Sequence, residues 1–460
     1  MGATSPALAL GDIARASAGA GCGEGWPNGR GASILRPMPI ALPVLNARLA
    51  LAVPAPHPAV SDSLASPPLS SSRDPHAEAP ADPAHATPAE LGDWRWQLRH
   101  RLSSKQEIAA LLPLTPDEDA ALDAAPGLFR VGITPYYFSL IDRAHPHCPV
   151  RMQVIPRTRE LLHEEGDLVD PLGEDAHSPA TGIFHRYPDR CLLLAIDRCA
   201  IYCRHCNRRR LVGQEESPIS RAALAGAIDY IRRTPAIRDV LISGGDPLTL
   251  STDRLEEIIA AVRAISHVEI IRIGTRVPVV LPMRIDDALC TMLRRYHPLF
   301  INTHFNHPKE LTPAARTACE RLADAGIPLG NQTVLLRGVN SSTRVMRRLF
   351  TELLKIRVRP YYLFQGDVAA GTSHLRTSVE TGIEIMQNLR GWISGLAIPH
   401  LVIDTPNGMG KVSIGPDYVV RRAADKWTLR NYEGHLVDYP QPTDQDPTCP
   451  YDEVYFGDRA

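Results

Sequence analysis

Residues 191–206 read CLLLAIDRCAIYCRHC, an apolar run of strand type followed at once by three cysteines. From this run onward, short apolar segments such as DVLISG, LFINT and HLVID alternate with helix-like stretches such as RLEEIIAAVRAI. Such alternation of buried-type strands with helices is typical of a parallel α/β fold. About six or seven such units favour a complete or partial barrel, in which the working residues lie just after the strands.

The barrel segment, expected over residues 181–415, is flanked by regions of different composition. Residues 1–89 are rich in Pro, Ala and Ser and hold 14 of the chain's 41 prolines, so we expect a disordered leader there. Residues 90–180 have apolar spacing of helical type and predict a helical N-terminal region. Residues 416–460 are polar with scattered aromatics, and we expect a C-terminal extension that packs on the surface or on a partner subunit.

The overall composition excludes several classes of protein. Fifty basic against 51 acidic residues give a net charge of −1, which removes the general electrostatic argument for binding nucleic acid or an anionic membrane. The apolar stretch Pro39–Val53 is interrupted by polar residues and proline, so we expect neither a signal peptide nor a membrane span. An odd total of 9 cysteines, three of them clustered, is unlike a secreted disulfide framework and favours the cytoplasm.

The cluster Cys199, Cys203 and Cys206 has the spacing C-x3-C-x2-C on a loop that leaves a strand. Three thiolates so close can hold one metal centre. A structural zinc site would need a fourth ligand, for which His205 is the nearest candidate. An iron–sulfur cluster normally takes four cysteines, so three would leave one iron open to a substrate or cofactor. Free thiols are the remaining alternative.

This spacing after the first barrel strand resembles the signature of the radical S-adenosylmethionine (radical SAM) superfamily. The wider string HRYPDRCLLLAIDRCAIYCRHCNRRR is similar to the lysine 2,3-aminomutase family, as are SGGDPL, IRIGTRVPVVLP, NTHFNHP, GIPLGNQTVLLRGVN, RVRPYYLFQGD and DTPNGMGK. The resemblance covers roughly residues 95–435. It implies a radical SAM-type partial (β/α)6 TIM-like barrel and an isomerase that moves the amino group of L-lysine from C2 to C3, giving β-lysine. The implied cofactors are a [4Fe–4S] cluster, SAM and pyridoxal 5′-phosphate (PLP).

The resemblance also implies individual roles. Cys199, Cys203 and Cys206 hold the cluster, and Lys411 forms the internal aldimine with PLP, the general use of lysine with this cofactor. The further contacts that it implies are Gly244, Gly245, Asp246, His304 and Gln332 for SAM and the active site, and Arg186 and Arg190 for the PLP phosphate. Taken alone, these would be a tight turn, core polar groups and surface arginines paired with neighbouring aspartates.

Substrate selection follows from charge. Arg208 falls where the family pairs an arginine with the amino-acid carboxylate, and Asp367 and Asp404 match the aspartates that clamp the distal ammonium of lysine. Two aspartates facing one pocket would be costly without a cation, which favours lysine over glutamate and leaves arginine open. The alternatives are therefore an arginine 2,3-aminomutase and, from another class, an iron–sulfur electron carrier or sensor. A carrier would need neither Lys411 nor the aspartates.

One family feature is missing from the sequence. Ser342 stands where relatives have a mid-chain cysteine for an intersubunit zinc, and the tail has only Cys449, so we expect no structural zinc. The expected partners are the amino-acid substrate, a flavodoxin- or ferredoxin-type reductant and further copies of the chain in a homo-oligomer.

Overall fold

The computed structural model describes residues 86–444. The expected leader, except at its end, and the tail with Cys449 lie outside the described residues. The described part contains a nine-stranded sheet in the order β1 to β9 and a separate three-stranded sheet. The strands of the large sheet are β1 (Ile183–Tyr187), β2 (Arg190–Ile196), β3 (Asp239–Gly244), β4 (Ile270–Gly274), β5 (Leu299–Thr303), β6 (Leu329–Leu335), β7 (Val358–Gln365), β8 (His400–Thr405) and β9 (Gly410–Ile414).

The large sheet is a parallel barrel sheet with an antiparallel strand at each end. Six consecutive parallel pairings join β2 through β8, so seven strands run parallel. The strands β1 and β9 pair antiparallel with β2 and β8. The helices between consecutive parallel strands are α7 (Arg221–Arg232), α8 (Thr252–Arg263), α10 (Asp287–Arg294), α11 (Pro313–Asp324), α12 (Thr343–Lys355) and α13 (Val379–Gln387). The expected (β/α)6 arrangement is thus present, with β8 as a further parallel strand.

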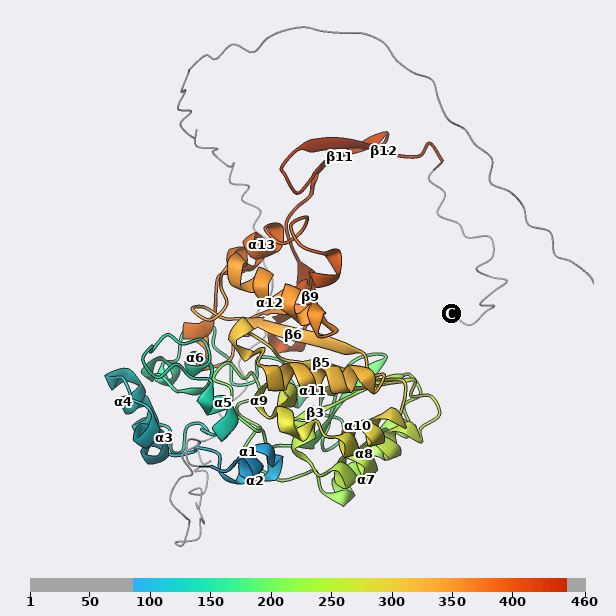
Figure 1. Cartoon of the computed structure of the whole chain (residues 1–460). Helices are drawn as coiled ribbons and strands as arrows, with labels where there is room; N and C mark the ends of the chain where they lie inside the picture. The colour runs from blue at the N-terminus through green and yellow to red at the C-terminus, as the bar shows by residue number, and fades with distance from the viewer. Residues whose placement is uncertain (1–85, 445–460) are drawn as a thin grey trace, which may run out of the picture. The chain divides into compact units, whose positions relative to one another are not determined.

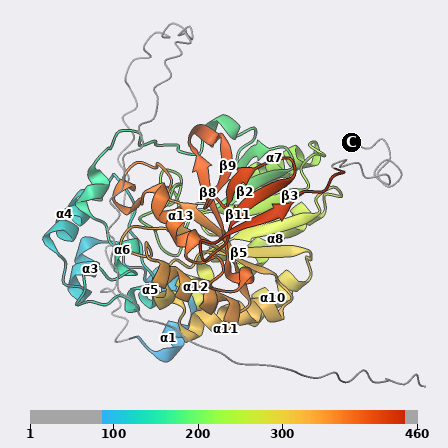
Figure 2. The same ribbon diagram turned by 90° about the horizontal axis from the view of Figure 1, so that it is seen from above.

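The helices cover the sheet through one apolar face each. In α12 the buried residues Met346, Leu349, Phe350 and Leu353 recur at helical spacing. Helices α7, α8, α10 and α11 follow one another along the outside of the sheet (Figure 1), and Figure 2 shows the same layer from above. The strands then have two different faces, because successive side chains point to opposite sides.

In β2 and β3, the first two parallel strands, successive side chains point alternately to the core and to a cavity. Leu193 of β2 and Val240 of β3 are fully buried in the core shared with the helices. Their neighbours Leu192 and Leu241 line a cavity on the other side of the sheet. The sequence of each strand therefore builds the core and the wall of a site at the same time.

Short helices precede and interrupt the barrel. They are α1 (Pro88–Gly92), α2 (Trp94–Arg99), α3 (Lys105–Leu111), α4 (Pro116–Ala124), α5 (Pro135–Ser139), α6 (Arg151–Val154), α9 (Val277–Val280) and the 3-10 turns η1 (Thr158–Leu161), η2 (Asp175–His177), η3 (Pro247–Thr249), η4 (Pro282–Arg284), η5 (Pro308–Glu310), η6 (Ser373–Leu375), η7 (Gly395–Ala397) and η8 (Pro406–Gly408). A capping box between Thr115 and Glu118 starts α4. The buried Glu118 also forms an ion pair with Arg151 of α6, so the cap and the packing of the two helices depend on one carboxylate.

The C-terminal part of the described chain forms the second sheet. Its antiparallel strands are β10 (Val419–Arg422), β11 (Lys426–Arg430) and β12 (Leu436–Pro440). All five residues of β12 are exposed. Among residues 86–444, no helix has the length and apolar character needed to cross a membrane.

Candidate active site

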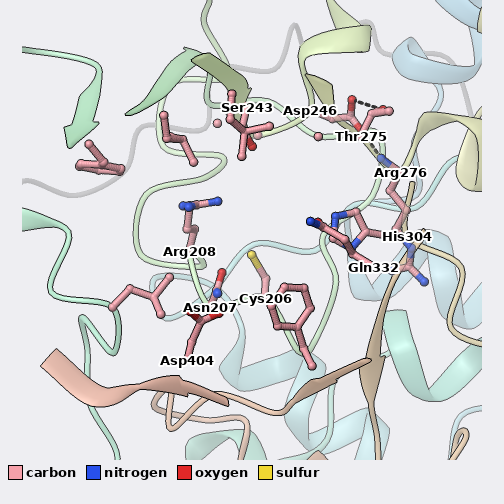
Figure 3. Close-up of a pocket in the computed structure, with 18 of the residues that line it drawn as sticks. Cys206, Asn207, Arg208, Ser243, Asp246, Thr275, Arg276, His304, Gln332 and Asp404 are labelled. Atoms are coloured by element: carbon pink, nitrogen blue, oxygen red, sulfur yellow. Dashed lines mark hydrogen bonds between the residues drawn. The ribbon is translucent and has the colours of Figure 1, made fainter. Parts of the chain in front are cut away.

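A cavity of about 570 Å³ lies at the carboxyl ends of the parallel strands, where a barrel carries its working residues. It gathers all the side chains that the sequence marked as site residues. They are Arg186, Arg190, Cys199, Cys203, Cys206, Arg208, Gly244, Gly245, Asp246, His304, Gln332, Asp367, Asp404 and Lys411. Figure 3 shows Arg208 and Asp404 on one side of this cavity and Arg276, His304 and Gln332 on the other.

The cysteine loop leaves β2 and is fixed at both ends. The Asp197 carboxylate accepts hydrogen bonds from three successive backbone N–H groups, those of residues 215–217. Within the loop, the backbone N–H of Arg204 donates to the Gln153 carbonyl of α6 over 2.9 Å. The N-terminal helices therefore hold the loop from outside the barrel.

The three cysteines of the loop are partly exposed, and all of them border the cavity. Over residues 86–444, no three His, Cys, Asp or Glu side chains are arranged to hold a single metal ion. His205, the candidate fourth zinc ligand, instead lies 3.3 Å from the Asn306 amide.

The glycines after β3 allow that strand's end to touch the cysteine loop. Gly244 has φ +122°, and a Cβ there would lie 2.2 Å from the Ile196 carbonyl oxygen. A Cβ on Gly245 would lie 2.3 Å from the Arg198 carbonyl oxygen. Any larger residue would push the two loops apart, so these positions require glycine.

Asp246 follows these glycines and is buried. Burial raises the pKa of its carboxyl, while hydrogen bonds from the Thr275 hydroxyl and the Arg276 backbone oppose that rise. The Thr275 Oγ1 donor lies 2.6 Å and the Arg276 N donor 2.7 Å from the carboxylate oxygens (Figure 3). The residues that follow β4 thus orient the carboxylate that the family resemblance places at the SAM and active site.

His304 and Gln332 come from neighbouring strands and face the cavity together (Figure 3). Burial lowers the pKa of His304 to about 4, and the positive charge of Arg276 contributes to the decrease. At neutral pH the imidazole is therefore uncharged and can both donate and accept a hydrogen bond.

Lys411 lies on β9 opposite Asp404 of β8, as its cross-strand partner. The Lys411 Nζ is 2.7 Å from the Asp404 carboxylate, whose side chain is only 6% exposed. The backbone N–H of Lys411 and the Arg186 Nη2 both donate to the Tyr187 hydroxyl, over 3.0 and 2.6 Å. The lysine of the Gly-rich loop is therefore held at the cavity wall.

The two arginines expected near the PLP phosphate differ in their exposure and in their hydrogen-bond partners. The Arg186 side chain is 15% exposed, and its Nε is buried without a hydrogen-bond partner. Arg190 is 39% exposed and forms an ion pair with Asp189 over 2.8 Å, as in the surface-arginine alternative, although it also lines the cavity. Arg186 thus has a buried donor that no protein group occupies.

The charged residues expected to select the substrate already have protein partners. The Arg208 Nε donates to Glu174 over 2.6 Å, and the Asn207 amide donates to Asp367 over 2.7 Å. Burial and the neighbouring Asp404 raise the pKa of Asp367 to about 6. A buried carboxylate with a second carboxylate beside it forms a site that favours a cation.

Two family models match the chain. The model of the radical SAM superfamily matches residues 193–349, and the model described as lysine-2,3-aminomutase matches residues 386–457. L-lysine 2,3-aminomutase of Clostridium subterminale is 52% identical over 361 residues, covering 78% of this chain and 87% of that protein. The chain belongs to the lysine 2,3-aminomutase family.

Relatives of similar identity are named for two different substrates. L-lysine 2,3-aminomutase of Fusobacterium nucleatum is 50% identical over 81% of this chain and 88% of that protein. Glutamate 2,3-aminomutase of Clostridioides difficile is 46% identical over 77% of this chain and 83% of that protein. Identity alone therefore does not separate the substrates in this family.

Sequence reasoning missed three residues of this aminomutase site. Asn207 and Arg276 lie inside two of the strings quoted above, directly after the cysteine motif and shortly after IRIG, so their positions could have been noticed. Glu174 directly precedes η2 in the N-terminal region and carries no such signal. Its contact with Arg208 is apparent only once the chain is folded.

Proposed function

We propose that the chain is an L-lysine 2,3-aminomutase, an isomerase that moves the amino group of L-lysine from C2 to C3 and forms β-lysine. The observation that carries this proposal is the charge pattern of one cavity: Arg208 for a carboxylate, and Asp367 with Asp404 for a cation, beside Lys411. The names of the relatives that are 50 and 52% identical support it.

The residues present fit the three cofactors that this activity requires. Cys199, Cys203 and Cys206 would hold the [4Fe–4S] cluster, because a guanidinium donates to one of the three sulfurs as expected beside a thiolate. Asp246 would hold the SAM amino group. Lys411 would bind PLP, whose phosphate suits the free Nε of Arg186. Bound together, the cluster and SAM supply hydrogen-atom abstraction, and PLP supplies a carrier for the migrating nitrogen.

The chain itself binds and orients the substrate. The terminal nitrogens of Arg208 bind the α-carboxylate of lysine, and Asp367 and Asp404 bind the distal ammonium. Contacts at the two ends of the lysine molecule fix which of its carbons faces the reaction centre. Such positioning supplies a large part of the rate acceleration by an enzyme.

Arginine remains the second candidate substrate, because its guanidinium is also a distal cation that a carboxylate pair can bind. Glutamate would place a third carboxylate against Asp367 and Asp404, which like-charge repulsion opposes. An electron carrier or sensor would leave Lys411 and both aspartates without a role.

The proposal also includes a reductant, an oligomeric state, a cellular compartment and a division into domains. A flavodoxin- or ferredoxin-type protein reduces the cluster, and the chain works as a homo-oligomer without a structural zinc. The thiol ligands place the enzyme in a reducing compartment, the cytoplasm. Within the chain we assign residues 1–89 to a leader, 90–180 to the helical region, 181–415 to the barrel with the PLP site, and 416–460 to the extension.

A competition assay tests the substrate assignment. The reconstituted enzyme is incubated anaerobically with PLP, SAM, dithionite and equal concentrations of lysine, arginine and glutamate, and the β-amino acids formed are separated and quantified. We expect β-lysine as the main product. β-Arginine without β-lysine would transfer the assignment to the arginine enzyme, and β-glutamate alone would refute the role of the aspartates.

A further inference from the structure

Arg276 has no individual role assigned so far, although it lines the cavity beside His304 and Gln332 (Figure 3). It directly follows Thr275 after β4 and is 7% exposed. Its Nη1 lies 2.8 Å from the Sγ of Cys203, the middle cysteine of the motif. Arg276 is thus a buried cation in direct contact with a cluster-loop thiol.

The guanidinium is held in place by polar groups from other elements. Its Nη2 donates to the Glu310 carboxylate over 2.8 Å, to the Gln153 side-chain oxygen over 2.5 Å and to the Tyr137 hydroxyl over 3.2 Å. Glu310 is completely buried, so it can neutralise the arginine without help from solvent. These contacts fix the direction in which Nη1 points.

The same residue is also connected to the SAM side of the site. Its backbone N–H donates to Asp246, the acid assigned to the SAM amino group, over 2.7 Å. The side chain and the backbone of one residue therefore contact the two halves of the expected cluster–SAM unit. The distance between the Cys203 sulfur and the Asp246 carboxylate depends on Arg276.

We propose that Arg276 is a positioning residue for the iron–sulfur cluster, whose hydrogen bond to Cys203 makes the cluster easier to reduce. The inference rests on the proposed assignment of the three cysteines to that cluster. One-electron reduction by dithionite adds a negative charge to the cluster and leaves its bonds to cysteine intact. A nearby cation stabilises the reduced form more than the oxidised form, and hydrogen bonds to cluster sulfurs are a recognised control of reduction potential.

Substitution of Glu310 should change the reduction potential in the direction opposite to substitution of Arg276. In Glu310→Gln the side-chain oxygen can still accept from Arg276, but the compensating negative charge is gone. The net positive charge beside Cys203 then increases, and the cluster should become easier to reduce. In Arg276→Gln the positive charge itself is lost, and the cluster should become harder to reduce.

The test is an anaerobic redox titration of the reconstituted cluster, followed by electron paramagnetic resonance, without SAM or lysine. The variants are Arg276→Gln, Arg276→Lys and Glu310→Gln. The matched control is Arg284→Lys, because Arg284 is another buried arginine but donates to the Leu248 and Leu250 carbonyls and not to a cysteine of the motif. Iron content and circular dichroism are measured for every sample.

We expect the reduced-to-oxidised ratio at a fixed potential to fall about tenfold in Arg276→Gln, which is about 59 mV for one electron. The reduction potential should fall less in Arg276→Lys and should rise in Glu310→Gln. In Arg284→Lys it should equal that of the wild type. Equal potentials in all iron-loaded variants would overturn the inference. If Arg276→Gln takes up no iron, the reduction potentials of Arg276→Lys and Glu310→Gln decide the question. Shifts of opposite sign from the wild-type potential support the inference. Equal potentials, or shifts of the same sign, refute it. A wild type that binds no cluster would instead refute the proposed function.

Discussion

Lys411 and Asp404 face each other across the hairpin of β8 and β9, and the Lys411 Nζ donates to the Asp404 carboxylate over 2.7 Å. The antiparallel register makes them direct cross-strand partners, so the pair is set by the fold and does not depend on loop flexibility. Asp404 thus binds a cation before any substrate arrives. When Lys411 serves the cofactor, the carboxylate becomes available for the distal ammonium of the substrate.

Replacement of Lys411 by alanine should abolish PLP binding and leave the cluster intact. The visible absorbance of lysine-bound PLP should disappear, while iron content should equal that of the wild type. Lys426→Ala is the matched control, because Lys426 pairs with the exposed Asp438 on the second sheet. Retained PLP absorbance in Lys411→Ala would refute the assignment.

Asp404→Asn should weaken lysine binding strongly. A charge-assisted hydrogen bond contributes about 1.5–3 kcal/mol, so we expect the KM for lysine to rise roughly tenfold to a hundredfold. The exposed Asp438→Asn serves as the control, since that carboxylate pairs with Lys426. An unchanged KM in steady-state assays of Asp404→Asn would contradict the proposed clamp.

Lysine binding should weaken as the pH falls below 6. Burial and Asp404 raise the pKa of Asp367 to about 6, so the carboxylate is charged above that pH and becomes protonated below it. Because only the charged form attracts the ammonium, we expect the KM for lysine to rise by up to about tenfold per pH unit below 6. In Asp367→Asn the KM should be high at every pH. A wild-type KM that stays flat between pH 5 and pH 7 would argue against this role.

Glu174→Gln should impair the recognition of the α-carboxylate. Glu174 holds the Nε of Arg208 at 2.6 Å and so directs its two terminal nitrogens. We expect a rise in KM of about tenfold with a smaller change in kcat, in line with the loss of one charged hydrogen bond. Glu269→Gln, which removes an exposed ion pair with Arg238, should behave like the wild type. A fall in kcat alone would indicate a different role.

The sequence predicted much of this architecture because its signals are local. The run that became β2 and the cysteine spacing lie within a few residues of one another, and strand–helix alternation is a property of neighbouring residues. Contacts between distant segments were not predictable in this way. Arg276 reaches Cys203 across 73 positions, and Arg208 reaches Glu174 across 34. Nothing at either position in the chain specifies its partner, because the barrel closure brings them together.

The most direct test of the account follows the migrating nitrogen. The reconstituted enzyme is supplied anaerobically with SAM, PLP, dithionite and L-lysine labelled with ¹⁵N at the α-amino group and ¹³C at C2 and C3, and the reaction is followed by NMR. We predict that the ¹⁵N coupling moves from C2 to C3 as β-lysine forms. Labelled lysine that stays unchanged while the enzyme carries its full iron and PLP would contradict the account.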